Sequence, residues 1–349
     1  MSSSSSVQEF VVHDDSAGVE LPPSSRRYRM VAAMIPLALS LLETREARSS
    51  LARVATDIIE AREGMTGVSR RRRPPHIYQG SRDNMGDWVD AFLRSLRENF
   101  PSIHISRAVE GEAETWKFDW GRDMRDYVAS DAGRLYLSAA IIDNMGNAQD
   151  QSPAVARDSY DLFKFQMVIS IAHEMVHLLT GFITGTREPN TPPRITAEPY
   201  NNQHDVGEAG RYWESRFLGG FVEFWSEPSN PLRARQAGVP YLFEAGPKRH
   251  AVGQRVSMSY IDDFLRGRFT FPIRASSSAP LVIRRDLERD GRCETTDLRK
   301  SRAFRDAEQV NSPPPEQSTD PARRYRAINP DPRNGYPAAG GASRRYYYS

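Results

Sequence analysis

Apolar residues recur at helical spacing in three parts of the chain. From Met30 to Ile59 they follow a helical period interrupted at Pro36, which predicts one or two amphipathic helices. Residues 84–100 predict another amphipathic helix. Leu162–Leu179 is apolar on most sides, as expected for a helix deep in a core, and Gly181 is placed to end it.

Strand patterns are shorter and fall between and after these helices. Residues 101–109 and 133–142 carry β-branched and alternating apolar residues, so both predict strands. Four later runs mix aromatic and β-branched residues with turns, and predict either strands of a subdomain covering the core or short elements packed on its back: 221–230, 239–246, 256–265 and 269–274. Helices around a small sheet predict a mainly helical α+β fold.

The two ends of the chain contain few large apolar residues. Residues 1–26 form a serine-rich leader, and residues 276–349 are rich in Arg, Asp, Glu, Pro and Ser, so we predict disorder in both. Residues 69–75, "SRRRRPP", predict an exposed linker. The folded domain is then residues 27–275, long enough for one sizeable core.

Net charge and cysteine content limit the classes of partner and the cellular compartments that we expect for this protein. A net charge of +2 on 349 residues argues against nucleic acid as a partner. The single cysteine, Cys293, excludes an intramolecular disulfide, so secretion is not supported and we expect an intracellular protein. The apolar run Met30–Leu42 is too short to span a membrane, and no membrane span is expected.

The apolar helix 162–179 carries a single polar line. At 3.6 residues per turn, five residues share one stripe: Gln166, Ser170, His173, His177 and Gly181. Imidazoles four residues apart can hold one metal ion in common, and zinc accepts such a pair. Glu174 lies about 100° round the helix, where it can reach a metal-bound water without becoming a ligand.

This arrangement has a chemical and a structural interpretation. A zinc-bound water has a pKa near neutrality, so a carboxylate such as Glu174 can take its proton and later pass it to a leaving amine. The alternative is two core histidines hydrogen-bonded to backbone, with Glu174 in an ion pair. Burying two imidazoles and a carboxylate without metal or partners is costly, which favours the metal site.

The H-E-x-x-H helix with His173, Glu174 and His177 resembles the zincin superfamily of zinc metallopeptidases. The resemblance implies a zincin-like fold and Zn²⁺ as cofactor. It also implies that residues 133–142 form an edge strand, which aligns an extended peptide or protein substrate by backbone pairing.

A catalytic zinc site needs a third protein ligand. No histidine follows His177 at the short metzincin spacing, so the candidates lie in residues 201–220: His204, Asp205, Glu208 and Glu214. We favour Glu208, because a glutamate on a second helix is the gluzincin pattern. The spacer after His177 is longer than in many gluzincins, which leaves Glu214 and His204 open.

The second helix is predicted to run from residue 206 to about 218, with Asp205 as its N-cap. Glu208 and Tyr212 share a face of it, whereas Glu214 lies roughly 120° away, so we expect only one glutamate to face the first helix. The small residues Gly207, Ala209 and Gly210 would let the two helices approach closely. The alternative is a surface helix whose acids pair with arginines.

An oxyanion formed during hydrolysis needs a donor. Tyr212 is the best placed of four candidates, which also include Arg211, His250 and Tyr260. The sequence thus predicts a gluzincin-type zinc metallopeptidase with Glu174 as general base. Its alternatives are a catalytically inactive zincin-like protein that binds metal or peptide in an interaction or regulatory role, and a metal-free helical scaffold.

Overall fold

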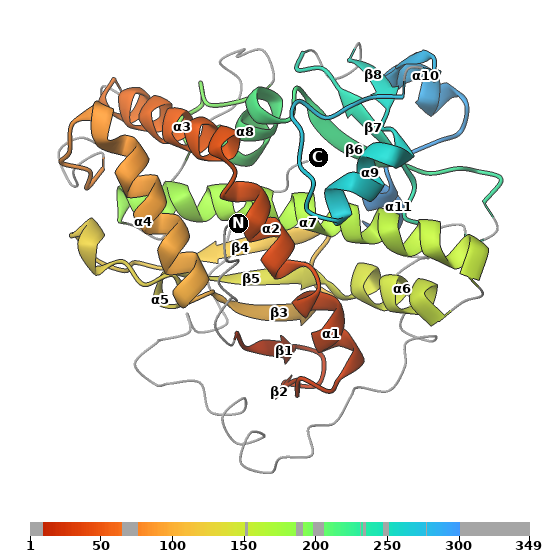
Figure 1. Ribbon diagram of the computed structural model, residues 1–349, viewed down its shortest axis with the longest axis horizontal. Coiled ribbons are helices and arrows are strands. Elements are labelled where there is room, and N and C mark those ends of the chain that lie inside the picture. The colour runs from red at the N-terminus through yellow and green to blue at the C-terminus, as the bar shows by residue number, and fades with distance from the viewer. Residues whose placement is uncertain are drawn as a thin grey trace, which may run out of the picture.

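The computed structural model describes residues 10–64, 76–150, 153–185, 191–197, 206–230, 232, 235–246, 251–276 and 278–300. Mixed helices and strands confirm the predicted α+β class (Figure 1). The assignment of the protein to the zincin fold stays a prediction. The predicted linker, residues 69–75, lies outside the described residues.

Four helices occupy the N-terminal part where apolar periodicity predicted helices: α1 (Arg26–Ala32), α2 (Ile35–Leu42), α3 (Arg45–Glu63) and α4 (Met85–Glu98). The run from Met30 to Ile59 is divided among three helices instead of one or two. Pro36 lies in the first turn of α2, where its missing N–H costs no helical hydrogen bond. Thr44 then caps α3 by accepting a hydrogen bond from the Ala47 N–H at 3.2 Å.

The larger sheet has five strands in the order β2-β1-β3-β5-β4. Its strands are β1 (Val12–Asp14), β2 (Val19–Glu20), β3 (Ser102–Ser106), β4 (Ala113–Lys117) and β5 (Gly133–Ser138). Strands β1, β3 and β5 are parallel, and β4 pairs antiparallel with β5. The strands predicted at 101–109 and 133–142 are confirmed in part, because β3 and β5 are shorter and residues 139–142 begin a helix, α6 (Ala139–Asp150). The expectation that 133–142 is an edge strand is wrong, because β4, which no sequence pattern predicted, covers that side of β5.

The long helix α7 (Pro153–Thr184) lies along this sheet, and α6 (Ala139–Asp150) precedes it. The predicted core helix is confirmed but is longer, because it continues past Gly181 and ends before Gly185, which has a φ of 69°. Residues Ser159–Thr184 are long and apolar enough to cross a membrane, yet 83% of the most apolar window is buried inside the protein. Their apolar character is therefore that of a core helix.

A second, antiparallel sheet follows α8 (Ala209–Phe217) in the order β6-β7-β8-β9. Its strands are β6 (Phe221–Trp225), β7 (Val239–Phe243), β8 (Val252–Arg255) and β9 (Leu281–Ile283). Strands at 221–230 and 239–246 match the sequence pattern, whereas 256–265 contains helix α9 (Met258–Leu265) and 269–274 has no regular element.

Both boundaries predicted for the folded domain are too narrow. Strands β1 and β2 lie in the predicted leader, and β9, α10 (Arg284–Arg289) and α11 (Thr295–Lys300) lie in the predicted tail. The side chain of Arg284 is buried and forms ion pairs with Glu223 and Glu294. One of these partners, Glu223 of β6, is distant in sequence and connects this charge-rich segment to the second sheet. Residues 1–9 and 301–349 lie outside the described part of the chain.

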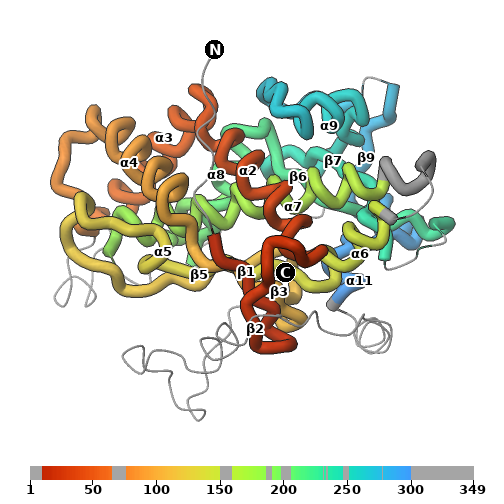
Figure 2. Tube along the Cα trace, turned by 60° about the horizontal axis from the view of Figure 1, so that its bottom comes forward, coloured from red at the N-terminus to blue at the C-terminus, as the bar shows by residue number. Residues whose placement is uncertain are grey.

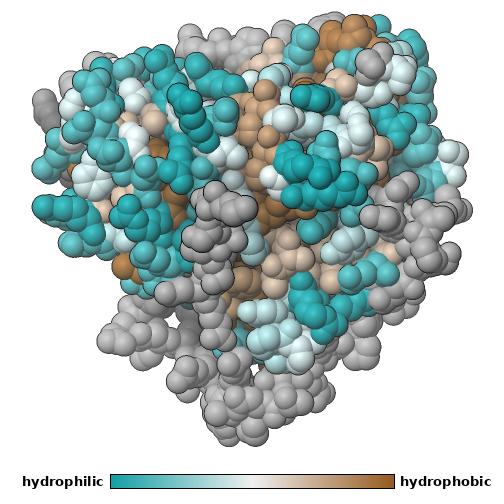
Figure 3. All heavy atoms as spheres, viewed as in Figure 1, coloured by the Kyte–Doolittle hydropathy of each residue, from teal (hydrophilic) through white to brown (hydrophobic). Residues whose placement is uncertain are grey.

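The helix α7 lies centrally, with the five-stranded sheet on one side and α8 and the second sheet on the other (Figures 1 and 2). Hydrophilic residues cover the part of the surface formed by α3 and α4, and a strip of hydrophobic residues runs near the middle of the same face (Figure 3). Helix α8 packs against both α7 and α3. The predicted polar stripe of α7 meets the start of α8, where Gly210 lies against His173.

Candidate metal centre

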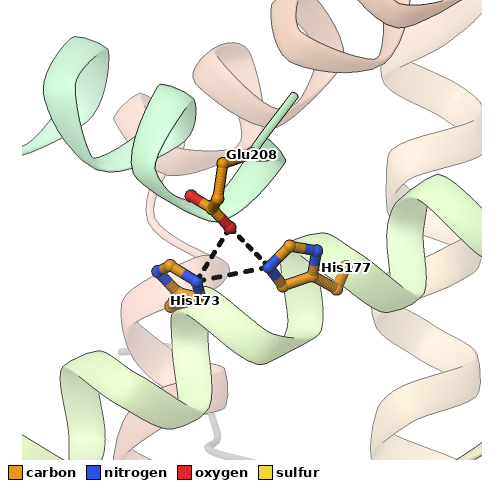
Figure 4. A group of neighbouring side chains, drawn as sticks. All are labelled: His173, His177 and Glu208. Atoms are coloured by element: carbon orange, nitrogen blue, oxygen red, sulfur yellow. Dashed lines mark hydrogen bonds and ion pairs between the residues drawn. The ribbon is translucent and has the colours of Figure 1, made fainter. Parts of the chain in front are cut away.

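Two histidines of α7 and a glutamate preceding α8 point at one another (Figure 4). The Nε2 atoms of His173 and His177 are 3.2 Å apart. The Oε1 atom of Glu208 lies 3.2 Å from the first and 2.7 Å from the second. The three residues favoured from the sequence as metal ligands therefore come together in the folded chain.

Glu208 holds this position from outside the helix. Helix α8 begins at Ala209 instead of residue 206, and Glu208 is its N-cap, with extended backbone at φ −131° and ψ 99°. Its Oε2 accepts a hydrogen bond from the Arg211 backbone N–H, which leaves Oε1 for the histidines. The Glu208 N–H donates to the Ile195 carbonyl at 2.8 Å, fixing the approach to the helix. The predicted N-cap, Asp205, lies outside the described residues.

Glu214 reaches the same histidine from its other side. Its Oε1 lies 2.5 Å from His173 Nδ1, and the residue is 2% exposed. The expectation that only one glutamate faces α7 is therefore wrong. Helical angles do not apply to Glu208, because it precedes the helix, so both acids can contact His173. When the ring is neutral and Nδ1 donates to Glu214, the Nε2 lone pair of His173 is directed at the ligand position.

The close approach of α8 to α7 depends on glycine, as predicted. A Cβ atom on Gly210 would lie 2.4 Å from two ring atoms of His173. A Cβ atom on Gly207 would lie 2.2 Å from the Pro192 carbonyl oxygen and 2.4 Å from that of Ile195. A side chain at either position would collide with these atoms, so α8 or the segment packed against it would have to shift.

The electrostatics of the group favour positive charge. Burial lowers the pKa of His173, but the carboxylates of Glu208 and Glu214 outweigh it and raise that pKa well above 6.5. Burial likewise raises the pKa of Glu208, but His173 and His177 outweigh it and hold the pKa well below 4.5. An ionised carboxylate between two imidazoles attracts a cation.

The donor set matches what zinc accepts. Ligand atoms about 2.0–2.1 Å from a tetrahedral zinc lie about 3.3–3.4 Å apart. Two of the three separations here are 3.2 Å, and the third is 2.7 Å. Two imidazole nitrogens, one carboxylate oxygen and an outer carboxylate on His173 are a combination found in zinc sites with one open position.

Glu174 lies on the same turn of α7 and is 9% exposed. Its carboxylate forms no hydrogen bond or ion pair with any residue in the described ranges, whereas its backbone carbonyl accepts a hydrogen bond from Thr115 Oγ1 of β4 at 3.3 Å. The edge strand is thus attached to the turn of helix that carries the H-E-x-x-H residues. Among the described residues Glu174 forms no ion pair at contact distance, although it interacts electrostatically with Lys117.

Lys117, the last residue of β4, was not singled out in the sequence. A Cβ atom on Gly181 of α7 would lie 3.6 Å from Lys117 Cδ, so the lysine stem passes over the helix one turn beyond His177. Burial lowers the pKa of Lys117, and the charges of Glu174 and Glu208 counteract this. Its segment, residues 115–131, has no regular hydrophobic pattern, so no sequence signal identified it.

Four residues were predicted as hydrogen-bond donors to an oxyanion, and those that the structure describes donate to other groups of the protein. Tyr212 OH donates to Asp57 Oδ2 of α3 at 2.9 Å. Arg211 Nη1 donates to Glu214 Oε2 at 3.1 Å, and Tyr260 OH donates to the Thr270 carbonyl at 3.0 Å. His204 and His250 lie outside the described residues.

Comparisons with protein-family models, curated proteins and solved structures found no match to the chain.

Proposed function

We propose that the chain is an intracellular, zinc-dependent metallopeptidase of gluzincin type that hydrolyses peptide bonds of a peptide or protein substrate. The observation that carries the proposal is the convergence of His173, His177 and Glu208 beside Glu174, whose carboxylate forms no hydrogen bond with a described residue. A structural ion-pair cluster would not need a further buried acid next to it.

The residues divide naturally into ligands and a general base. His173, His177 and Glu208 would hold the zinc, with Glu214 orienting His173 through Nδ1. Bound zinc supplies a water of near-neutral pKa and polarises a carbonyl group. Glu174 would accept the proton of that water as it attacks and deliver it to the leaving amine.

Strand β4 offers a place for the substrate. Among the described strands it ends the sheet, so one side of its backbone is not paired within that sheet. An extended peptide can add to such an edge by main-chain hydrogen bonds. The contact between Thr115 and the Glu174 backbone would bring a peptide on this edge close to the general base.

Metal content tests the site itself. We expect near-stoichiometric zinc by inductively coupled plasma mass spectrometry in the full chain and loss of zinc in Glu208→Ala. Glu98, exposed near the end of α4, provides the matched control. Zinc in Glu98→Ala but not in Glu208→Ala supports the ligand set. Absence of zinc from the reconstituted wild type would refute the proposal.

Hydrolysis of a peptide library tests the chemistry. Glu174→Gln should retain zinc and lose cleavage, because the amide cannot take up the proton of the attacking water. Glu98→Gln should cleave as the wild type does. Full activity in Glu174→Gln would rule out the assigned base, and a zinc-loaded wild type that cleaves no peptide would indicate a metal- or peptide-binding protein instead.

A further inference from the structure

Peptide hydrolysis at the proposed centre requires a donor for the oxygen that becomes negative. In the attack, a bond forms between the water oxygen and the carbonyl carbon, and the π electron pair moves to the carbonyl oxygen. The water proton goes to Glu174 and then to the amine as the C–N bond breaks. The three donors predicted from sequence and described by the structure are all engaged: Arg211, Tyr212 and Tyr260.

Lys117 is a cation that the fold brings close to the proposed metal centre. Its stem lies over Gly181, on the same stripe of α7 as His173 and His177. Glu174 and Glu208, the proposed base and third ligand, are the two carboxylates that act on its charge. Lys117 is half-buried and forms no hydrogen bond or ion pair with another residue in the described ranges.

The strand that carries Lys117 strengthens the argument. Lys117 is the last residue of β4, the strand proposed to pair with the substrate backbone. A peptide on that edge would place a carbonyl group between the end of β4 and α7. A lysine held there is a preorganised donor, because its side chain need not rearrange before its N–H groups can reach the oxygen.

We propose that Lys117 is a catalytic residue that donates a hydrogen bond to the oxyanion of the tetrahedral intermediate. It keeps its proton throughout, so the proton balance of the reaction still runs from water through Glu174 to the amine. This inference rests on the proposed peptidase function and adds to it the group that stabilises the transition state.

The test compares zinc-loaded full-length variants on one cleaved peptide. Lys117→Met removes the charge but keeps an apolar stem, Lys117→Gln is a second neutral variant, and Lys117→Arg keeps the charge. Lys164→Met, at a half-buried lysine of α7 upstream of the histidines, is the matched control. Zinc content and circular dichroism of each variant establish that its site and fold are retained.

We expect kcat to fall about 10²- to 10³-fold in both neutral variants, with KM changed by less than about threefold. Affinity for a phosphonate peptide analogue, which carries a tetrahedral anion, should fall by a similar factor when measured by calorimetry. Lys117→Arg should recover part of both losses. Lys164→Met should behave as the wild type.

Three outcomes would overturn the inference. The first is unchanged kcat and unchanged phosphonate affinity in both neutral variants. The second is a rise in KM confined to substrates with a free C-terminal carboxylate, which would make Lys117 a carboxylate-binding residue. The third is a wild type without zinc or cleavage, which would remove the proposed function as well. Loss of cleavage in Glu174→Gln alongside a fully active Lys117→Met would refute only the role of Lys117.

Discussion

Replacement of Gly210 by alanine is the sharpest perturbation of the metal centre that changes none of the proposed ligand residues themselves. The added Cβ would lie 2.4 Å from His173 Cδ2 and Nε2, whereas ordinary contacts begin near 3.4 Å, so α8 and the imidazole must separate by about 1 Å. Metal–ligand distances tolerate only about 0.2 Å. Glu208, two residues before Gly210, would move with the helix.

The size of the effect follows from two opposing contributions. Alanine in place of glycine stabilises a helix by up to about 1 kcal/mol, and overpacking costs about 1–3 kcal/mol. We therefore expect Gly210→Ala to lower the free energy of unfolding. Zinc affinity should fall at least as much as on loss of an outer-shell partner, about 10- to 100-fold.

Gly86 provides the matched control. It is the second residue of α4, as Gly210 is of α8, and a Cβ there would meet nothing within 4 Å. Gly86→Ala should bind zinc as the wild type does and be equally or more stable. The assay is competition with a chromophoric chelator for zinc, together with urea unfolding. Wild-type zinc affinity in Gly210→Ala would refute the claimed packing of α8 on His173.

Three further outcomes follow from the structure. Glu214→Gln should weaken zinc binding about 10- to 100-fold by chelator competition, because His173 loses the charged partner of Nδ1; unchanged affinity would contradict that role. Burial and the charge of Glu294 raise the pKa of Glu223 to about 7. The folded state therefore binds this proton more tightly than the unfolded state does. As a result, the free energy of unfolding should fall as pH rises from about 4.5 to 7. Urea titrations at pH 5 and 8 should show a smaller fall in Glu223→Gln; equal falls would contradict the shift. Tyr212→Phe should keep kcat within about threefold and lower the free energy of unfolding by about 1 kcal/mol, since its hydroxyl bonds to α3; a large loss of kcat alone would restore it as a catalytic candidate.

The sequence determined helices α4 and α7 and the histidine pair of the site. Apolar spacing identified α4 and α7, and the i, i+4 spacing of His173 and His177 ensured that both imidazoles leave α7 on one side. These are local properties of a single helix, set by 3.6 residues per turn. The choice of Glu208 rested on resemblance and on nearby glycines, and the structure brings that residue to the histidines.

Only the tertiary structure decided which groups surround the histidines. Glu214 contacts His173 because Glu208 precedes α8, a displacement of the helix start that helical angles could not reveal. Lys117 lies against α7 because β4 pairs with β5 on the side opposite to β3. Sheet topology sets this arrangement, and no local sequence pattern indicates it. Likewise, Arg284 is buried against an acid distant in sequence, Glu223 of β6. Spacing along one element is fixed by backbone geometry, whereas contacts between elements depend on where the whole chain places them.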